Sequence, residues 1–410
     1  MEPAIPSAPF SYLMTKRYAI LSIFLILISL CAGAQKKEIA QAQNIIKSGK
    51  DVYKAEQQMR SLLNDSVHRK NLKVWATLTD AMRSQYLAGN EKMYLRQKQD
   101  TAALFRLALQ MFSDYQSMDS VDATPDAKGR VKLKYRGSHA EFLDNYRPNL
   151  YHGGIFFIRK QDYKNAYSML DAFLDCLRQP LFSDSHYEKD SLNCPAAFWT
   201  VYCGYQLQNY EMAVKYKDLA LRDSLHLDRC LQYFAEFYRQ RDENEQYEAT
   251  LMEGLQHYPE SPYFFSHLID YCNTHEQQDK AMKIVDDALA NDSTSELFLF
   301  AKSSLLLNLG EYDSCIAICD TLISRNDSLA DPYYNAGVSY MNKAFLVEKG
   351  KMGARQRRQV RQHFRQALPY LERYRVLAPD EKQKWGPALY NIYLRLNMGK
   401  EFEEIDRILR

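Results

Sequence analysis

Few residues of this sequence have the types and the spacing that a catalytic reaction requires. His152-Gly153-Gly154 is similar to the loop that forms an oxyanion hole, but no GxSxG motif supplies a nucleophilic serine. The acidic pairs Asp286-Asp287 and Glu403-Glu404 lie on predicted helix surfaces, where solvated side chains are the expected interpretation. No nucleotide-binding loop, SxxK or HExxH motif is present, and the nine histidines lack metal-ligand spacing. We therefore predict a protein that is not an enzyme, with no catalytic residue, no metal and no cofactor.

A basic stretch is the clearest candidate for a charged binding surface. It contains seven basic side chains and is opposed only by Glu348: Lys349, Lys351, Arg355, Arg357, Arg358, Arg361 and Arg365. Arg358, Arg361 and Arg365 recur at i, i+3 and i+7, so they can share one face of a helix. We predict that Arg355, Arg357, Arg358 and Arg361 contact an anionic partner, such as phosphate headgroups, an anionic glycan or an acidic protein. The alternative is a solvated, self-repelling extension of a helix.

Residues 1–34 have the pattern of a secretory signal peptide. Lys16 and Arg17 precede an apolar run over 18–32, and Ala32-Gly33-Ala34 is a small-x-small cleavage site. We predict cleavage after Ala34, export, and a periplasmic or outer-membrane-associated location. An uncleaved anchor and lipidation at Cys31 are alternatives, although Leu30 is bulky for a lipidation motif. Translation starting at Met14 would give a signal peptide of standard length.

The cysteines do not form a disulfide framework that the sequence can assign. Cleavage leaves seven of the eight, from Cys176 to Cys319, and no CxxC motif is present. An odd number leaves at least one thiol unpaired in the monomer. We expect small buried residues, with a Cys176–Cys194 disulfide as the alternative.

Composition favours long helices. Glycine (15) and proline (13) are scarce among the 410 residues, which argues against many short strands joined by turns. With 53 basic and 51 acidic residues, nothing points to nucleic acid as a partner. Tyrosine is unusually frequent, at 30 residues.

Self-comparison shows a repeat of constant length. Ala213, Tyr247, Ala281 and Cys315 occupy equivalent positions at equal intervals, which gives a repeat length of about 34 residues. Each unit is predicted to hold two helices, for example over 264–271 and 279–289. In the second of these, apolar residues recur at i, i+3, i+4, i+7 and i+8, as on an amphipathic helix.

These residues resemble the tetratricopeptide repeat (TPR) family. Small, aromatic and apolar residues follow the family's pattern at Gly154, Phe157, Tyr163, Ala166, Leu170 and Phe173. Leu309-Gly310-Glu311-Tyr312 matches the turn between the two helices, and Gly337 with Tyr340 matches the first helix. The unit at 198–221 departs from the pattern, because Val201 stands where glycine is commoner. The resemblance implies an all-α fold, a right-handed α-solenoid of stacked helix-turn-helix hairpins.

The predicted organisation has four parts. After the signal peptide (1–34), divergent helical repeats fill 35–118, a linker or exposed loop covers 119–147, and the TPR array covers 148–410. The helices expected in the divergent repeats span 39–47, 52–63, 72–86 and 101–118. Two insertions break the period, near 180–194 and near 345–362.

The resemblance further implies a concave groove lined by the first helices of the hairpins. The predicted partner-binding residues are Tyr151, Tyr202, Tyr205, Arg229, Arg239, Tyr263, Asn273 and Tyr334. Tyrosine and arginine are frequent in interface hot spots. The implied function is a non-enzymatic exported scaffold that binds a protein or peptide in this groove, in cell-envelope assembly. The alternative is a helical-repeat protein that binds glycan at the cell surface.

Overall fold

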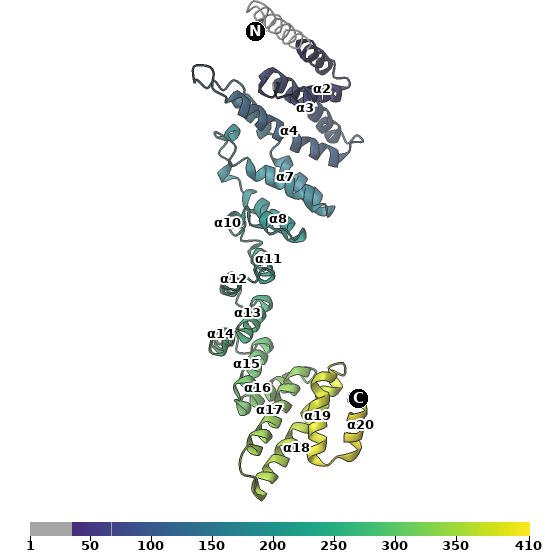
Figure 1. Ribbon diagram of the computed structural model, residues 1–410, viewed down its shortest axis with the longest axis vertical. Helices are drawn as coiled ribbons and strands as arrows, with labels where there is room; N and C mark the ends of the chain where they lie inside the picture. Colours follow the sequence, from purple (N-terminus) through teal and green to yellow (C-terminus); the bar gives the residue numbers. More distant parts are fainter. Residues whose placement is uncertain (1–34, 67) are drawn as a thin grey trace, which may run out of the picture. The chain divides into compact units, whose positions relative to one another are not determined.

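The computed structural model describes residues 35–66 and 68–410, and this part of the chain is helical, without strands (Figure 1). It divides into two compact units, Met1–Tyr233 and Phe234–Arg410, which are described separately below. The predicted signal peptide and its alternatives at Cys31 and Met14 lie outside the described residues.

The first unit consists of helices that pack on their neighbours in sequence, drawn in purple to teal in Figure 1. Residues 35–48 are helical. They are followed by α2 (Val52–Leu63), α3 (Leu72–Tyr94), α4 (Thr101–Asp122), α5 (Arg136–Asp144), α6 (Pro148–Arg159), α7 (Tyr163–Asp175), α8 (Asn193–Gln206), α9 (Tyr210–Val214) and α10 (Lys217–Ala220). Single 3₁₀ turns occupy His68–Lys70, Pro180–Phe182 and Tyr187–Lys189. Helix α11 (Leu227–Gln240) begins in this unit and ends in the second.

The second unit continues as helical hairpins, drawn in green to yellow. Its helices are α12 (Asn244–His257), α13 (Pro262–Thr274), α14 (Gln278–Asn291), α15 (Glu296–Leu309), α16 (Tyr312–Arg325), α17 (Ala330–Glu348), α18 (Ala354–Leu377), α19 (Lys382–Leu396) and α20 (Gly399–Leu409). The prediction of an all-α fold built from stacked helix-turn-helix hairpins is confirmed. The right-handed sense of the stack stays a prediction.

The repeat length appears directly in where the second helix of each hairpin begins. Helices α9, α12, α14 and α16 begin at equal intervals along the chain, one repeat length apart. The fourth residue of each is the predicted repeat position, and all four of these side chains are buried: Ala213, Tyr247, Ala281 and Cys315. At three of the four positions the residue is small (Ala213, Ala281 and Cys315), which lets the first helix of the hairpin approach closely, since ridges on one helix must fit grooves on the other.

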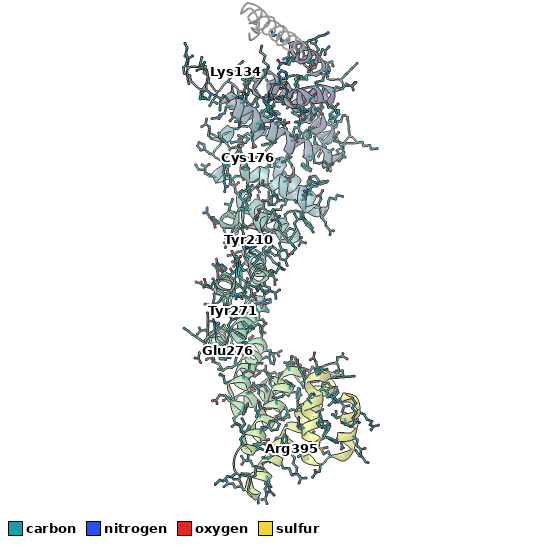
Figure 2. The ribbon with its side chains drawn as sticks, in the orientation of Figure 1. Lys134, Cys176, Tyr210, Tyr271, Glu276 and Arg395 are labelled. Carbon is teal, nitrogen blue, oxygen red and sulfur yellow. The ribbon has the colours of Figure 1, made fainter. Side chains whose placement is uncertain are left out.

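The turns between the paired helices repeat with the same period. One residue in each turn has a left-handed backbone conformation, with φ between 51° and 81°: Gln208, Asp242, Glu276 (labelled in Figure 2) and Gly310. The next amide donates a hydrogen bond to the carbonyl oxygen five positions earlier, as Gln277 N does to Cys272 O at 2.8 Å. This is the hydrogen bond of a Schellman helix end. Only Gly310 adopts the conformation without steric cost, which explains why this turn alone matches the family pattern in the sequence.

The segment 119–147, predicted as a linker or exposed loop, is helical in part. Helix α4 runs to Asp122 and α5 occupies Arg136–Asp144, so 123–135 is a loop and 145–147 is a turn. The buried Asp119 pairs with Arg136 at 2.7 Å, and the buried Asp122 accepts the amide of Lys134 at 2.6 Å. These contacts fasten the loop 123–135 to the helices, and Lys134 stands at the base of the loop (Figure 2).

The two insertions are accommodated in different ways. Residues 180–194 form two 3₁₀ turns, and Leu181 and Phe182 are buried. Residues 345–362 instead lengthen a hairpin, because α17 and α18 have 19 and 24 residues, compared with 14 in α16. Antiparallel helices can grow together at their shared end, which keeps the hairpin packed throughout.

The seven cysteines of residues 35–410 are free thiols, and all except Cys194 are buried. The alternative of a Cys176–Cys194 disulfide is therefore wrong. Burial raises the pKa of the Cys176 thiol and of the Cys203 thiol to about 12 each.

We expect Cys194 alone among these seven to react with a thiol reagent at pH 8 in the folded protein. The thiolate is the reactive form of cysteine. Burial blocks access of the reagent to the other six thiols. For Cys176 and Cys203, burial also disfavours ionisation. Peptide mass spectrometry after a short iodoacetamide pulse measures this, with urea-unfolded protein as the fully reactive control. Labelling of Cys176 at its unfolded rate would contradict the packing.

The same thiols predict the direction of a pH effect. The pKa values of Cys176 and Cys203 in the folded state lie above the ordinary value of 9.0, so the folded state holds these protons more tightly than the unfolded state. Their contribution to stability is fully present below pH 9 and is lost as the pH rises towards 12.

Candidate functional site

An aromatic face lies on the first helices of the hairpins in the first unit. We define the aromatic face as Tyr151 of α6, Trp199, Tyr202 and Tyr205 of α8, and Tyr233 of α11, all of them partly exposed. The indole of Trp199 meets the Tyr202 ring edge to face at 5.5 Å between centroids. The Tyr233 ring stacks on Tyr205 at 4.4 Å and lies 6.0 Å from Tyr202. Four rings are thus in continuous contact.

The local sequence explains how these rings share one face. Trp199, Tyr202 and Tyr205 recur at every third position, which places them along one ridge of α8. On the opposite side of this helix Val201 and Gly204 are buried. Helix α8 therefore has one packed side and one aromatic side.

Neighbouring side chains hold the rings in place. Tyr163, which opens α7, meets Tyr202 edge to face at 5.8 Å. His226 stacks on the buried Phe198 ring at 4.2 Å and 11°, and its Nδ1 lies 2.9 Å from a carboxylate oxygen of the buried Asp223. The surface is consequently preorganised, and little side-chain entropy remains to be lost when a ligand binds.

The hydroxyl groups of Tyr151, Tyr202 and Tyr233 on this face are neutral at physiological pH. Burial, reinforced by a hydrogen bond with Tyr163, raises the pKa of Tyr202 to about 12. Burial also raises the pKa of Tyr151 and of Tyr233. The face therefore combines apolar ring surface with neutral hydroxyl groups that can donate or accept hydrogen bonds.

The structure places the predicted partner-binding residues in both units. Tyr151, Tyr202 and Tyr205 belong to the aromatic face, and Arg229 is exposed with its Nε 4.0 Å from Asp228. In the second unit, Asn273 is exposed on α13 and Tyr334 packs on Tyr374 at 5.1 Å. A single concave groove that joins all eight predicted residues stays a prediction.

Arg239 and Tyr263 form a polar cluster within the second unit. The Arg239 guanidinium pairs with Glu236 at 2.8 Å, and the Tyr263 hydroxyl donates to the same carboxylate at 3.4 Å. The hydrogen bond that Arg239 donates to the Glu236 carboxylate raises the pKa of Arg239. A ligand that binds here would have to compete with Glu236 for the Arg239 guanidinium and the Tyr263 hydroxyl. This cluster is therefore a weaker candidate for a binding site than the aromatic face.

The predicted anionic-partner patch lies on the first turns of α18. Arg355, Arg357, Arg358 and Arg361 are exposed. None of the four forms an ion pair within the described part of the chain, whereas Lys343 of the preceding helix pairs with Asp313.

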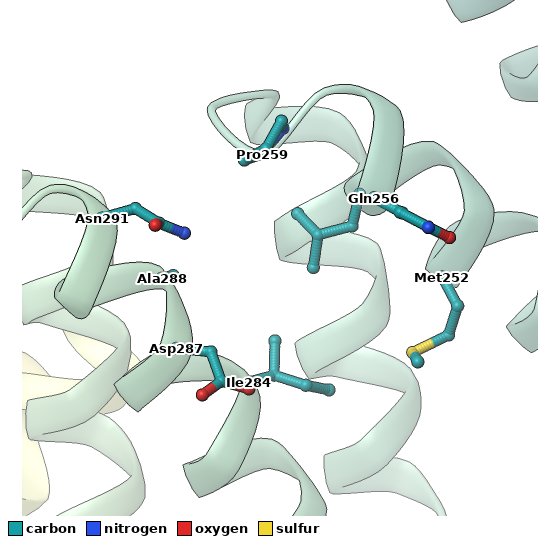
Figure 3. A pocket seen from close by; sticks show the side chains of 8 residues that line it. Met252, Gln256, Pro259, Ile284, Asp287, Ala288 and Asn291 are labelled. Carbon is teal, nitrogen blue, oxygen red and sulfur yellow. The ribbon is translucent and has the colours of Figure 1, made fainter.

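A small apolar cleft was not predicted from the sequence. It has a volume of about 280 Å³ and lies between α12 and α14, the second helices of neighbouring hairpins (Figure 3). Its lining combines apolar and polar side chains: Met252, Leu255, Gln256, Pro259, Ile284, Asp287, Ala288 and Asn291. None of the predicted site residues contributes to it.

Metal sites and membrane-spanning helices are both absent from the described residues. No group of three His, Cys, Asp or Glu side chains is placed to hold a metal ion over 35–66 and 68–410. Within the same ranges, every helix is too short or too polar to cross a membrane. That the chain is not an enzyme stays a prediction.

Sequence reasoning missed two members of the aromatic face, Trp199 and Tyr233. They stand one repeat length apart, so they occupy the same repeat position. A search for large aromatic residues that recur at the repeat length would have identified them.

Comparison with known proteins gives distant likenesses only. No protein-family model matches the chain, and no curated protein matches it either. A MamA structure, residues 41 to the end, from Desulfovibrio magneticus RS-1 is 13% identical; it covers 45% of this chain and 95% of its own, with a TM-score of 0.35. YrrB, described as a TPR protein with an unusual peptide-binding site, is 18% identical, covers 48% of this chain and 92% of its own, and has a TM-score of 0.34.

The human IFIT1 dimer with m7Gppp-AAAA spans more of the chain. It is 12% identical and covers 84% of this chain and 73% of its own, with a TM-score of 0.38. At these identities and TM-scores the likenesses carry no argument about what this chain binds.

Proposed function

We propose that this chain is a scaffold that binds a protein or peptide partner through the aromatic face of its first unit. The observation that supports the proposal is the continuous contact of Trp199, Tyr202, Tyr205 and Tyr233 on a partly exposed helix surface. Rigid tyrosine and tryptophan rings contribute large contact areas at low entropic cost, and they dominate interface hot spots.

The location of this activity is also part of the proposal. The signal-peptide pattern of 1–34 supports a role for this protein outside the cytoplasm, in assembly of the cell envelope. The intact mass of the protein recovered from cells tests this, because retention of residues 1–34 would contradict the predicted cleavage.

Removing the aromatic rings should weaken partner binding. Peptides are first selected for binding to the wild-type protein from a displayed random library. For the selected peptides, Tyr202→Ala/Tyr205→Ala is expected to raise Kd by about 30-fold or more, since two hot-spot rings contribute about 2 kcal/mol or more. Isothermal titration calorimetry gives the Kd values.

The matched control is Tyr53→Ala/Tyr94→Ala, which removes two rings that are 58% and 87% exposed and lie outside the aromatic face. This control should bind as the wild type does. Equal Kd values for Tyr202→Ala/Tyr205→Ala and the wild type, with unchanged thermal unfolding, would show that the peptides bind elsewhere. The glycan alternative would be favoured if an oligosaccharide binds the wild type, binds Tyr202→Ala/Tyr205→Ala more weakly, and is not displaced by the selected peptides.

A further inference from the structure

The end of the α17–α18 hairpin has an unusual charge distribution. From 349 to 371 the chain contains seven lysine and arginine residues and no aspartate or glutamate. Six of the seven lie in the loop 349–353 or in the first turns of α18, so positive charge is concentrated at the point where the two helices meet. We call residues 346–361 the hairpin tip.

Nothing within the second unit neutralises this charge. Glu348, the nearest acidic residue in sequence, is already paired with Arg395 of α19 at 2.8 Å (Arg395 is labelled in Figure 2). The basic side chains of the hairpin tip are exposed and form no ion pair within the described residues. Their charge is therefore available to an external ligand.

Packing fixes which way the charged side chains point. On α18 the buried residues Val360, Phe364, Ala367 and Leu371 form one stripe. Phe364 packs against Phe345 of α17 at 5.7 Å. Because this stripe holds the helix against its partner, Arg357, Arg358 and Arg361 remain on the solvent side.

The hairpin tip also exposes apolar side chains beside the charges. Leu346 is 53% exposed and Met352 is 38% exposed. Helical hairpins with exposed apolar residues flanked by lysine and arginine suit the interface of an anionic bilayer, where the apolar groups enter and the basic groups meet phosphates. Single-stranded nucleic acid is recognised with aromatic rings on which bases stack, and residues 346–361 include no aromatic residue.

We infer that the hairpin tip docks on an anionic lipid surface, with Leu346 and Met352 entering the headgroup region and the basic side chains contacting lipid phosphates. This interaction is separate from the aromatic face, since it uses residues of the other unit. It would hold the protein at a membrane through a peripheral contact.

Flotation with lipid vesicles tests the inference. Full-length protein, with its N-terminus mapped by mass spectrometry, is mixed with phosphatidylcholine vesicles with or without phosphatidylglycerol. Wild-type protein should bind the anionic vesicles more strongly than the neutral ones. Arg355→Gln/Arg357→Gln/Arg358→Gln should lower this binding at least tenfold, because each basic residue near an anionic surface contributes about fivefold. Leu346→Ser/Met352→Ser should lower it about threefold or more.

The control for charge is Lys283→Gln/Lys382→Gln/Lys400→Gln, which removes three exposed lysines from other helices of the same unit. This control should bind vesicles as the wild type does. The inference fails if the arginine variant binds anionic vesicles like the wild type. It also fails if that variant loses binding to a short single-stranded RNA or to heparin while its vesicle binding is unchanged, because the hairpin tip would then recognise a polymer.

Discussion

Replacing Arg147 with alanine is expected to lower the free energy of unfolding of the first unit by about 3 kcal/mol. Arg147 directly precedes α6, and its side chain is only 3% exposed. The guanidinium forms an ion pair with Asp190, donates to the Phe173 carbonyl oxygen at 3.3 Å and donates to the Asn193 side chain at 3.1 Å. One side chain thus connects the start of α6, the end of α7 and the insertion 180–194.

Aromatic contacts add to this connection. The guanidinium carbon lies 3.7 Å from the centroid of Phe173 and 4.0 Å from that of Tyr187. Such cation–π contacts strengthen when they are shielded from water. Alanine would remove them and leave the buried Asn193 side chain without its donor, while Asp190, which is 27% exposed, could turn to solvent. Because Asp190 can become solvated in this way, we expect a loss of stability at the lower end of the range found when a buried ion pair is broken.

Urea unfolding combined with hydrogen exchange measures the loss. Peptides that cover 176–206 should exchange faster in Arg147→Ala than in the wild type. The control is Arg159→Ala, which removes an exposed arginine at the other end of α6 and should change stability by less than about 0.5 kcal/mol. Equal stability of the two variants would mean that the insertion is not fastened by Arg147.

A second large effect is expected for Gly204→Ala, which should cost about 3 kcal/mol. A Cβ atom at Gly204 would lie 2.7 Å from the backbone nitrogen of Ala213 and 2.9 Å from its Cα. These are backbone atoms of α9, so the contact could be relieved only by moving one helix away from the other. This contact explains why Val201 can stand where the family pattern has glycine: in this hairpin Gly204 makes the close contact between the helices.

Thermal unfolding followed by circular dichroism measures the effect. The matched control is Gly137→Ala, since a Cβ atom there would meet nothing within 4 Å. Alanine is the better helix former, so this control should leave stability unchanged or raise it by up to about 1 kcal/mol. A loss in Gly204→Ala no larger than in Gly137→Ala would show that α8 and α9 can separate without cost.

The parts of the fold that sequence reasoning predicted are those with local causes. The spacing of Ala213, Tyr247, Ala281 and Cys315 depends on packing within one hairpin, and the structure buries all four. Helix α2 has the predicted bounds, Val52–Leu63.

The parts that could not be predicted depend on residues far apart in sequence. Arg147 meets Asp190 and Asn193, although the whole of α6 and α7 separates them along the chain. Asp119 looked like a loop residue until its partner Arg136 was placed. The aromatic face was found only in part. Its tyrosines on α6 and α8 followed from the family pattern. The repeat spacing of Trp199 and Tyr233 is visible in the sequence, but the contact between α8 and α11 is what joins Tyr233 to the other rings.

The recurring turn has a consequence for how the length of this chain can change. In the second unit each hairpin packs on the hairpins next to it, and helices α12 to α17 begin at positions set by one constant repeat length. If a segment of one repeat length is deleted or duplicated between two such turns, the residues at the new junction again occupy equivalent positions in the repeat. An insertion or deletion of any other length within a helix would rotate its buried apolar stripe away from the helix on which it packs. Duplication and deletion of whole hairpins are therefore the length changes that this architecture tolerates, and other insertions are confined to the ends of hairpins, where 180–194 and 345–362 are found.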